Sequence, residues 1–302
     1  MDFIEAKALR HFLAVVRVGS IRGAADKLGL APSVVSRQIT DLEQRLGLSV
    51  FERTARGVVL TEAGELLLQH GRHVSEEQAL LEEQFVRLRG QGSGHVRIVC
   101  GEGFVGDLIE NGLKSFAAIY PDVRHSLTLG NTDAIQNAVT GGEADIGIAY
   151  NPPIDVRARA LAIRRQPLCL VAPPGDGLLE RSEVRLADCL DRPLALLTAG
   201  HGVRQLVGGL AAQESLALAP VLETSSIQAL CRFAVAGLGV TFLPAFAVAR
   251  EAATGLVGAR ELADPTLREA GAHLIVRSHR RLPKSVERLA TCLSQTMQAF
   301  RD

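Results

Sequence analysis

This 302-residue chain has few cysteines, no long hydrophobic run and no net charge, and each absence excludes a class of protein. The five cysteines are odd in number and show no C-x-x-C or other ligand spacing, so neither a disulfide scaffold nor a cysteine metal site is expected. The most apolar stretch, residues 233–243, falls short of the ~20 residues that a membrane span needs. A hydrophobic content of 47% is too high for a disordered chain and predicts a globular protein.

Motifs of enzymes and of exported proteins are missing as well. The sequence has no G-x-S-x-G, P-loop, zinc signature or paired carboxylates, so no catalytic residue, cofactor or metal is predicted. His70 and His73 share a helix face with Glu77, but a solvated surface is a better interpretation than a metal site. Cys100 is expected to be a buried, inert thiol. The acidic residues among the first five do not fit a signal peptide, so a cytoplasmic location is expected.

The first 60 residues carry a helix-turn-helix pattern and a charge of +3, from nine Lys and Arg against six Asp and Glu. Three short apolar periodicities of helical type are separated by Gly19–Ser20 and Gly29–Leu30, and Ser20 can cap the second helix. On the third helix a stripe of small polar residues and one arginine lies opposite the apolar stripe. Such a stripe suits the major groove of DNA, although a solvated helix face is the alternative. Residues 50–60 suggest a basic hairpin that would meet the DNA backbone or minor groove. The predicted DNA contacts are Pro32, Ser33, Ser36, Arg37, Thr40, Arg53 and Arg56.

A long helix is predicted after Thr61, which can cap it. A seven-residue apolar period along this helix predicts a coiled-coil seam and therefore a dimerisation helix. The neighbouring seam is poor, since it contains Gly64 and Gly71, which weaken a helix but permit close approach. The glycine-rich stretch 90–94 then predicts a flexible hinge. The seam consists of Leu67, Val74, Leu81 and Leu88.

From residue 95 onward, strand patterns alternate with helix patterns. This alternation predicts an α/β domain with mostly parallel sheets and ligand sites at the carboxyl ends of the strands. The turns that follow strands supply polar candidates, each of which is a plain helix cap on the alternative interpretation. Strands are predicted at 96–100, 125–129, 144–150, 167–172, 193–197, 239–243 and 272–277, and helices at 108–119, 132–140, 227–236 and 283–301.

Several of these stretches resemble the LysR-type transcriptional regulators. The resemblance covers the opening, through L-R-H-F-L-A-V at 9–15, A-A-D-K-L at 24–28 and L-T-E-A-G at 60–64. It extends to G-E-A-D-I-G-I at 142–148 and A-G-L-G-V-T-F-L-P at 236–244. The resemblance implies a winged helix-turn-helix, a linker helix, and two α/β lobes like those of type 2 periplasmic binding proteins. It further implies promoter DNA as a partner, a small-molecule effector between the lobes, and assembly into homodimers or dimers of dimers.

The resemblance divides the chain into a DNA-binding domain at 1–60, a dimerisation helix at 61–89, a hinge at 90–94 and an effector domain at 95–302. Within the effector domain, lobe I is expected at about 95–166 and 268–302, and lobe II at about 167–267. The alternative is a small-molecule-binding protein or enzyme with an accessory DNA-binding domain. The expected effector contacts are Gly101, Glu102, Gly103, Phe104, Asn131, Thr132, Thr198, His201, Arg204, Thr224 and Ser225.

Two positions depart from the family pattern. Ala31 stands where relatives often carry a Ser or Thr helix cap, and Pro32 stands where many have Gln. Glu102 follows the first strand of the effector domain, where many relatives place a hydroxyl that holds an effector carboxylate. If the Glu102 carboxylate faces the cleft, it repels an acid; if it is a helix N-terminal acid, it leaves ligand choice alone. The first case predicts a neutral or amine-bearing effector, or one whose acid group turns toward Arg204.

Overall fold

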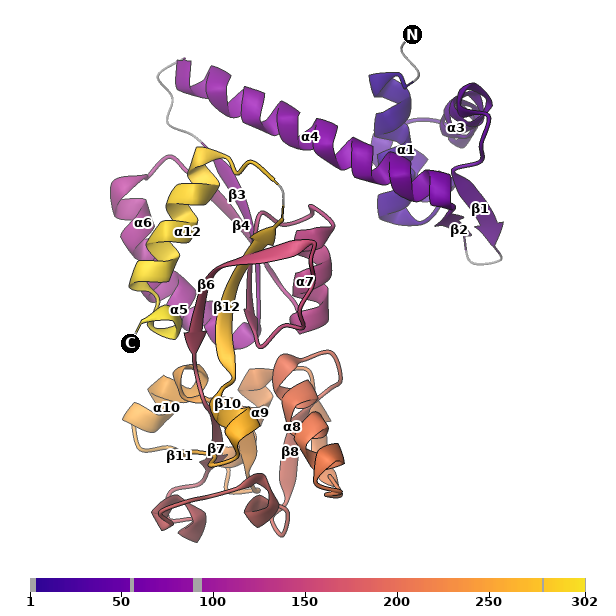
Figure 1. Ribbon diagram of the computed structural model, residues 1–302. Helices are drawn as coiled ribbons and strands as arrows, with labels where there is room; N and C mark the ends of the chain where they lie inside the picture. Colours follow the sequence, from indigo (N-terminus) through magenta and orange to yellow (C-terminus); the bar gives the residue numbers. More distant parts are fainter. Residues whose placement is uncertain (1–3, 55–56, 89–93, 279, 302) are drawn as a thin grey trace. The chain divides into compact units, whose positions relative to one another are not determined.

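A computed structural model describes residues 4–54, 57–88, 94–278 and 280–301 (Figure 1). The chain forms two compact units, Met1–Gln84 and Phe85–Asp302. Within the described residues, no helix is both long enough and apolar enough to cross a membrane. The predicted hinge residues 90–93 and the predicted DNA contact Arg56 lie outside the described residues.

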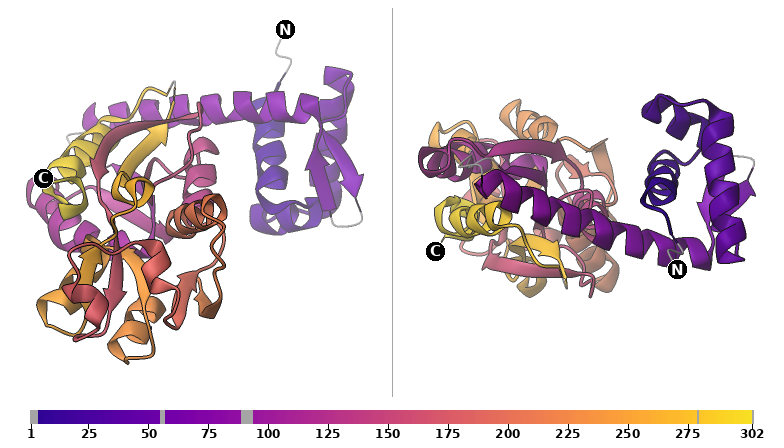
Figure 2. Two further views of the ribbon diagram at one scale, coloured as in Figure 1. Left: turned by 60° about the horizontal axis from the view of Figure 1, so that its bottom comes forward. Right: turned by 90° about the horizontal axis from the view of Figure 1, so that it is seen from above.

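The first unit contains three short helices, a hairpin and most of a long helix (Figure 2). The predicted caps are confirmed: Ser20 Oγ accepts from the Gly23 amide at 3.2 Å, and Thr61 Oγ1 accepts from the Gly64 amide at 3.0 Å. Gly29 ends the second helix in a left-handed conformation, which glycine adopts without steric cost. The elements are α1 (Ala6–Val18), α2 (Ile21–Leu28), α3 (Pro32–Leu46), β1 (Phe51–Thr54), β2 (Gly57–Leu60) and α4 (Glu62–Leu88).

The first half of the long helix α4 packs into the core of the first unit. Leu67 is 4% exposed, so it is not free to form the predicted dimer seam, and Val74 is half-buried against the same core. A Cβ on Gly71 would lie 2.9 Å from the Leu13 side chain, so this glycine is what lets α4 approach α1. The seam prediction is therefore wrong for Leu67, and for Val74 it stays a prediction. Leu81 remains 51% exposed, and the Leu88 side chain is not described.

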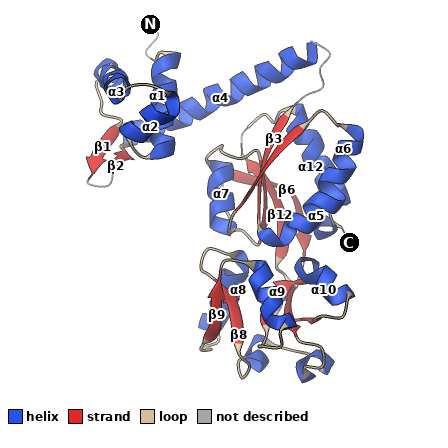
Figure 3. Cartoon of the chain, turned by 180° about the vertical axis from the view of Figure 1, so that it is seen from behind, coloured by secondary structure: helices blue, strands red, loops and turns tan. Residues whose placement is uncertain are grey.

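The second unit begins with a five-stranded sheet in the order β4-β3-β5-β12-β6, here called the first lobe. Helix α7 covers one face, where it packs on Val99, Ala149 and Ile275, and α6 and α12 cover the other (Figures 1 and 3). The strands are β3 (His95–Cys100), β4 (Arg124–Leu129), β5 (Ile146–Tyr150), β6 (Ala158–Arg165) and β12 (Gly271–Arg277). The helices are α5 (Val105–Asp107), α6 (Lys114–Ile119), α7 (Thr132–Thr140) and α12 (Lys284–Thr296).

The chain then forms a second lobe and returns to the first through β12. This lobe has a three-stranded sheet, β10-β7-β11, and a parallel pair, β8-β9. Its strands are β7 (Leu168–Ala172), β8 (Leu194–Leu197), β9 (Pro220–Thr224), β10 (Thr241–Pro244) and β11 (Gly258–Glu261). Its helices are α8 (Gly202–Gln213), α9 (Ile227–Val235) and α10 (Ala249–Ala253), and α11 (Pro265–Arg268) follows.

The predicted α/β class is confirmed, but the prediction of mostly parallel sheets is wrong. β12 runs antiparallel to both β5 and β6, and β10 and β11 run antiparallel to β7. Sequence analysis also missed β6, whose Ala, Leu and Arg residues favour a helix locally. Pairing with β12 along its length overrides that preference. Helix α8 was missed because three glycines, Gly202, Gly208 and Gly209, dilute its signal.

Candidate functional site

The polar stripe of α3 lies on the surface of the first unit. Ser33, Arg37 and Thr40 are exposed and Ser36 is half-exposed, while Val35, Ile39 and Leu42 on the opposite side are buried. Pro32 is also exposed, at the first turn. Arg37 has no hydrogen bond or ion pair to any other residue that the structure describes, so its guanidinium is available to a partner.

The amino end of α3 lacks a side-chain cap, as the sequence predicts. Ala31 occupies the cap position in an extended conformation, and Pro32 opens the helix. An uncapped amino end leaves backbone N–H groups and the positive end of the helix dipole accessible, which favours an anion such as a phosphate.

The predicted hairpin is confirmed as β1 and β2, which pair antiparallel with Phe51 opposite Leu60. The Val58 amide donates to the Gly19 carbonyl at 3.0 Å, which ties the hairpin to the turn between α1 and α2. Arg53 lies in β1, but its side chain is not described. The structure therefore supports a wing beside α3 and leaves the orientation of both wing arginines as a prediction.

A cavity of about 390 Å³ lies where the two lobes of the second unit meet. It is bordered by the turn after β3, the start of α7, the turn before α8 and the start of α9. The structure brings together nine of the predicted effector contacts in its wall: Gly101, Glu102, Gly103, Phe104, Asn131, Thr132, Thr198, His201 and Ser225.

Arg204 and Thr224 do not line this cavity, so these two site predictions are corrected. Arg204 lies in the first turn of α8, and a Cβ on Gly208 would lie 2.9 Å from its Nη1, so the guanidinium extends along the helix toward its carboxyl end. Thr224 Oγ1 instead accepts from the Ser226 amide at 3.1 Å within its own turn. A cationic Arg204 is thus not in place to receive an acidic ligand.

The Glu102 carboxylate reaches from the first lobe to the amino end of α9 in the second. Its Oε2 accepts from the Ile227 amide at 2.5 Å, and its Oε1 accepts from the Ser226 hydroxyl at 3.1 Å and the Gln228 amide at 3.4 Å. Glu102 therefore both lines the cavity and caps a helix, and that helix lies 125 residues away in the chain. Neither of the two alternatives drawn from the sequence described this arrangement.

A second bridge between the lobes forms at the amino end of α8. Thr132 Oγ1 accepts from the Gly202 amide at 2.8 Å, and the Asp133 amide donates to the Gly200 carbonyl at 3.2 Å. Asn131 is a true helix cap, since its Oδ1 accepts from the Ala134 amide at 2.8 Å. Both bridges pair a polar group of the first lobe with a helix start in the second.

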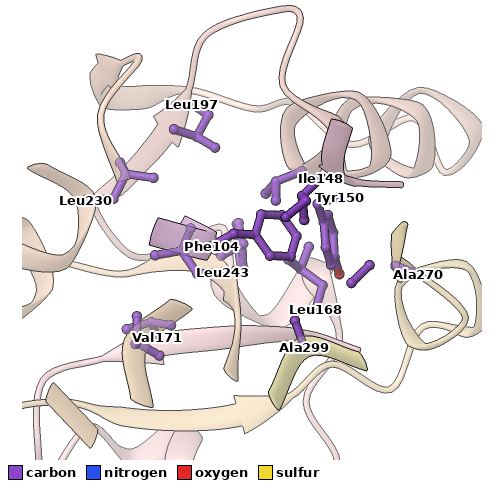
Figure 4. Close-up of a cluster of buried hydrophobic side chains, with 14 of the residues drawn as sticks. Phe104, Ile148, Tyr150, Leu168, Val171, Leu197, Leu230, Leu243, Ala270 and Ala299 are labelled. Carbon is purple, nitrogen blue, oxygen red and sulfur yellow. The ribbon is translucent and has the colours of Figure 1, made fainter. Parts of the chain in front are cut away.

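Apolar side chains complete the cavity wall, and sequence analysis missed most of them. The Phe104 ring stacks on the Phe246 ring with centroids 4.7 Å apart. Figure 4 shows Phe104 and Tyr150 among buried side chains, together with Leu197 and Leu243 from the second lobe. The Tyr150 hydroxyl donates to the Gln166 carbonyl at 2.8 Å, so it is already engaged. Apart from Phe104, their position at or near strand ends was the available signal, but their apolar character gave no reason to single them out.

Neither thiol nor metal chemistry finds support in the described residues. All five cysteines are free, and burial raises the pKa of the Cys100 thiol to about 12, so it stays protonated at neutral pH. The described residues contain no group of three His, Cys, Asp or Glu side chains that could hold a metal ion.

Taken together, a helix-turn-helix with a wing and a two-lobed α/β domain around a ligand-sized cavity define a ligand-responsive DNA-binding regulator. Sequence profiles agree: "Bacterial regulatory helix-turn-helix protein, lysR family" matches residues 6–65 and "LysR substrate binding domain" matches residues 89–298. The chain belongs to the LysR family of transcriptional regulators.

Individual relatives agree with this assignment. The chain is 30% identical to the transcriptional regulator YofA of Bacillus velezensis, over 81% of this chain and 82% of that one. A full-length OxyR variant from Pseudomonas aeruginosa has the same fold, with a TM-score of 0.73, 20% identity, and coverage of 97% of this chain and 95% of that one. Full-length CbnR, solved in complex with its target DNA, gives a TM-score of 0.59 at 20% identity and covers 97% and 99%.

Proposed function

We propose that this regulator binds promoter DNA through the exposed stripe of α3 and the wing, and holds its effector in the cavity between the lobes. The observation that carries the DNA interface is the two-faced character of α3. Its apolar face is buried in the unit, while Ser33, Arg37 and Thr40 face outward beside an uncapped helix start. CbnR, whose fold this chain shares, was solved on its target DNA.

Substitution of Arg37 tests the DNA interface. Arg37→Ala should weaken operator binding by ~1–3 kcal/mol if the guanidinium reads a base, and should lower the salt dependence if it holds a phosphate. Arg159→Ala removes the same charge from an exposed site on β6 and should leave DNA binding unchanged. Unaltered footprints and unaltered affinity for Arg37→Ala would remove this residue from the interface.

The cavity is proposed as an effector site rather than an active site. Of its titratable side chains, the Glu102 carboxylate is held by α9 and the Tyr150 hydroxyl by a backbone carbonyl. His201 remains, with Nδ1 3.1 Å from the Thr198 carbonyl. One histidine beside an engaged carboxylate supports ligand binding better than acid–base catalysis.

The proposal also covers the domain boundaries of the chain and its self-association. We infer a DNA-binding domain at 1–60, a linker helix at 61–89, a hinge at 90–94 and a two-lobed effector domain at 95–302. Self-association is proposed through the exposed part of α4 that includes Leu81, because an apolar side chain 51% exposed on a helix suits a partner helix. We also infer a cytoplasmic location, because a transcriptional regulator acts where the DNA is.

A further inference from the structure

The amino end of α9, a natural position for an anion at the cavity, is occupied by the protein's own carboxylate. Glu102 accepts from the Ile227 and Gln228 amides, and Ser226 Oγ accepts from the Ala229 amide at 3.2 Å. These three amides are the donors that would otherwise hold a ligand anion. An acidic ligand at α9 must therefore displace Glu102.

The rest of the cavity wall offers a negative ligand no compensation. Its described lining residues include no Lys or Arg, and the Arg204 guanidinium extends along α8 toward Gly208. His201 Nδ1 lies 3.1 Å from the Thr198 carbonyl oxygen and 3.4 Å from the Thr198 hydroxyl, so this ring nitrogen is already engaged by its own turn. Among the described lining residues, no Lys or Arg side chain is therefore available to balance the negative charge of a ligand.

The Glu102 carboxylate can also accept one more hydrogen bond. A carboxylate has about four acceptor positions, and the Ser226 hydroxyl and two amides take three of them. The Phe104 and Phe246 rings, which stack on each other, give the cavity wall an apolar surface. A ligand with an apolar or aromatic body and a protonated amine satisfies both features.

We propose that Glu102 is a built-in carboxylate that fills the anion position of α9, so that the cavity selects a cationic amine and excludes simple carboxylates. This inference rests on the proposed effector role of the cavity. The same three hydrogen bonds make Glu102 a link between the lobes, because they join the turn after β3 to the amino end of α9.

Calorimetric titration of the full-length protein with benzylamine, benzyl alcohol and benzoate at neutral pH tests the selection. The three probes share one ring and differ in charge. The unmutated protein should bind benzylamine at least tenfold more tightly than benzoate. Glu102→Ser should free the α9 amides and reverse this order, whereas Glu102→Gln should abolish the preference while keeping an acceptor on α9. Glu223→Gln removes the same charge from exposed β9 and should keep the original order.

Three outcomes would overturn the inference, and each refutes a different part of it. Benzoate binding as tight as benzylamine binding in the unmutated protein refutes the charge selection alone. An unchanged order in both Glu102 variants shows that Glu102 does not set it. Failure of every probe to bind any form, with operator binding intact, overturns the effector role of the cavity together with the selection. Glu102→Gln, which keeps the size of the side chain, carries the test if Glu102→Ser unfolds.

Discussion

Gly202 is the position where one added methyl group should force the two lobes apart. It opens α8 in the second lobe, and a Cβ there would lie 1.9 Å from the Tyr150 carbonyl oxygen of the first lobe. Real Cβ atoms keep at least 3.0 Å from such a neighbour, so the backbones must separate by about 1 Å. That movement also stretches the 2.8 Å hydrogen bond from the Gly202 amide to Thr132 Oγ1, which is buried.

The expected cost follows from overpacking at a buried contact. Such substitutions cost ~1–3 kcal/mol, and a domain of this size loses about 2–4 °C in Tm per kcal/mol, so Gly202→Ala should melt roughly 2–12 °C lower. Tyrosine fluorescence is a selective reporter, because the chain has no tryptophan and its two tyrosines, Tyr120 and Tyr150, both lie in the second unit.

Gly209→Ala is the matched control on the same helix. A Cβ at Gly209 meets nothing within 4 Å, and alanine is the better helix former by about 1 kcal/mol, so this variant should melt at or above the unmutated protein. Equal melting temperatures for Gly202→Ala and the unmutated protein would contradict the argument, since the lobes would then tolerate a contact that the structure forbids.

Two further predictions concern stability and assembly. Arg97 and Arg280 hold Asp145 with contacts of 2.9 and 2.8 Å; burial alone would raise the pKa of this carboxyl, but these hydrogen bonds and charges lower it. Ionised Asp145 therefore stabilises the fold at neutral pH. This stabilisation is lost as the pH falls from about 4, the pKa of an unfolded Asp, through the lower pKa of the folded protein. Asp145→Asn should remove this pH dependence and lower the free energy of unfolding in urea at pH 7 by ~3 kcal/mol. Leu81→Asp should reduce self-association in sedimentation and weaken operator binding; unchanged sedimentation would show that α4 is not the dimer contact.

Local features of this protein are determined by the sequence alone. The Ser20 and Thr61 caps, the uncapped start at Ala31 and the buried stripe of α3 all depend on residues within a few positions of one another. Side chains three or four residues apart on a helix meet whatever the rest of the chain does, so their pattern predicts the element and its buried face. Nine of the predicted effector contacts line the cavity for a similar reason, because they follow strand ends.

Long-range partners were decided only by the tertiary structure. Leu67 and Val74 share a seven-residue period with Leu81, but packing in the first unit buries Leu67, partly buries Val74 and leaves Leu81 exposed. β6 has a helix-favouring composition and becomes a strand because β12 pairs with it. The Glu102 carboxylate finds its donors on α9, 125 residues away. Such contacts depend on how the lobes close on each other, and no local spacing encodes which helix start will face a given carboxylate.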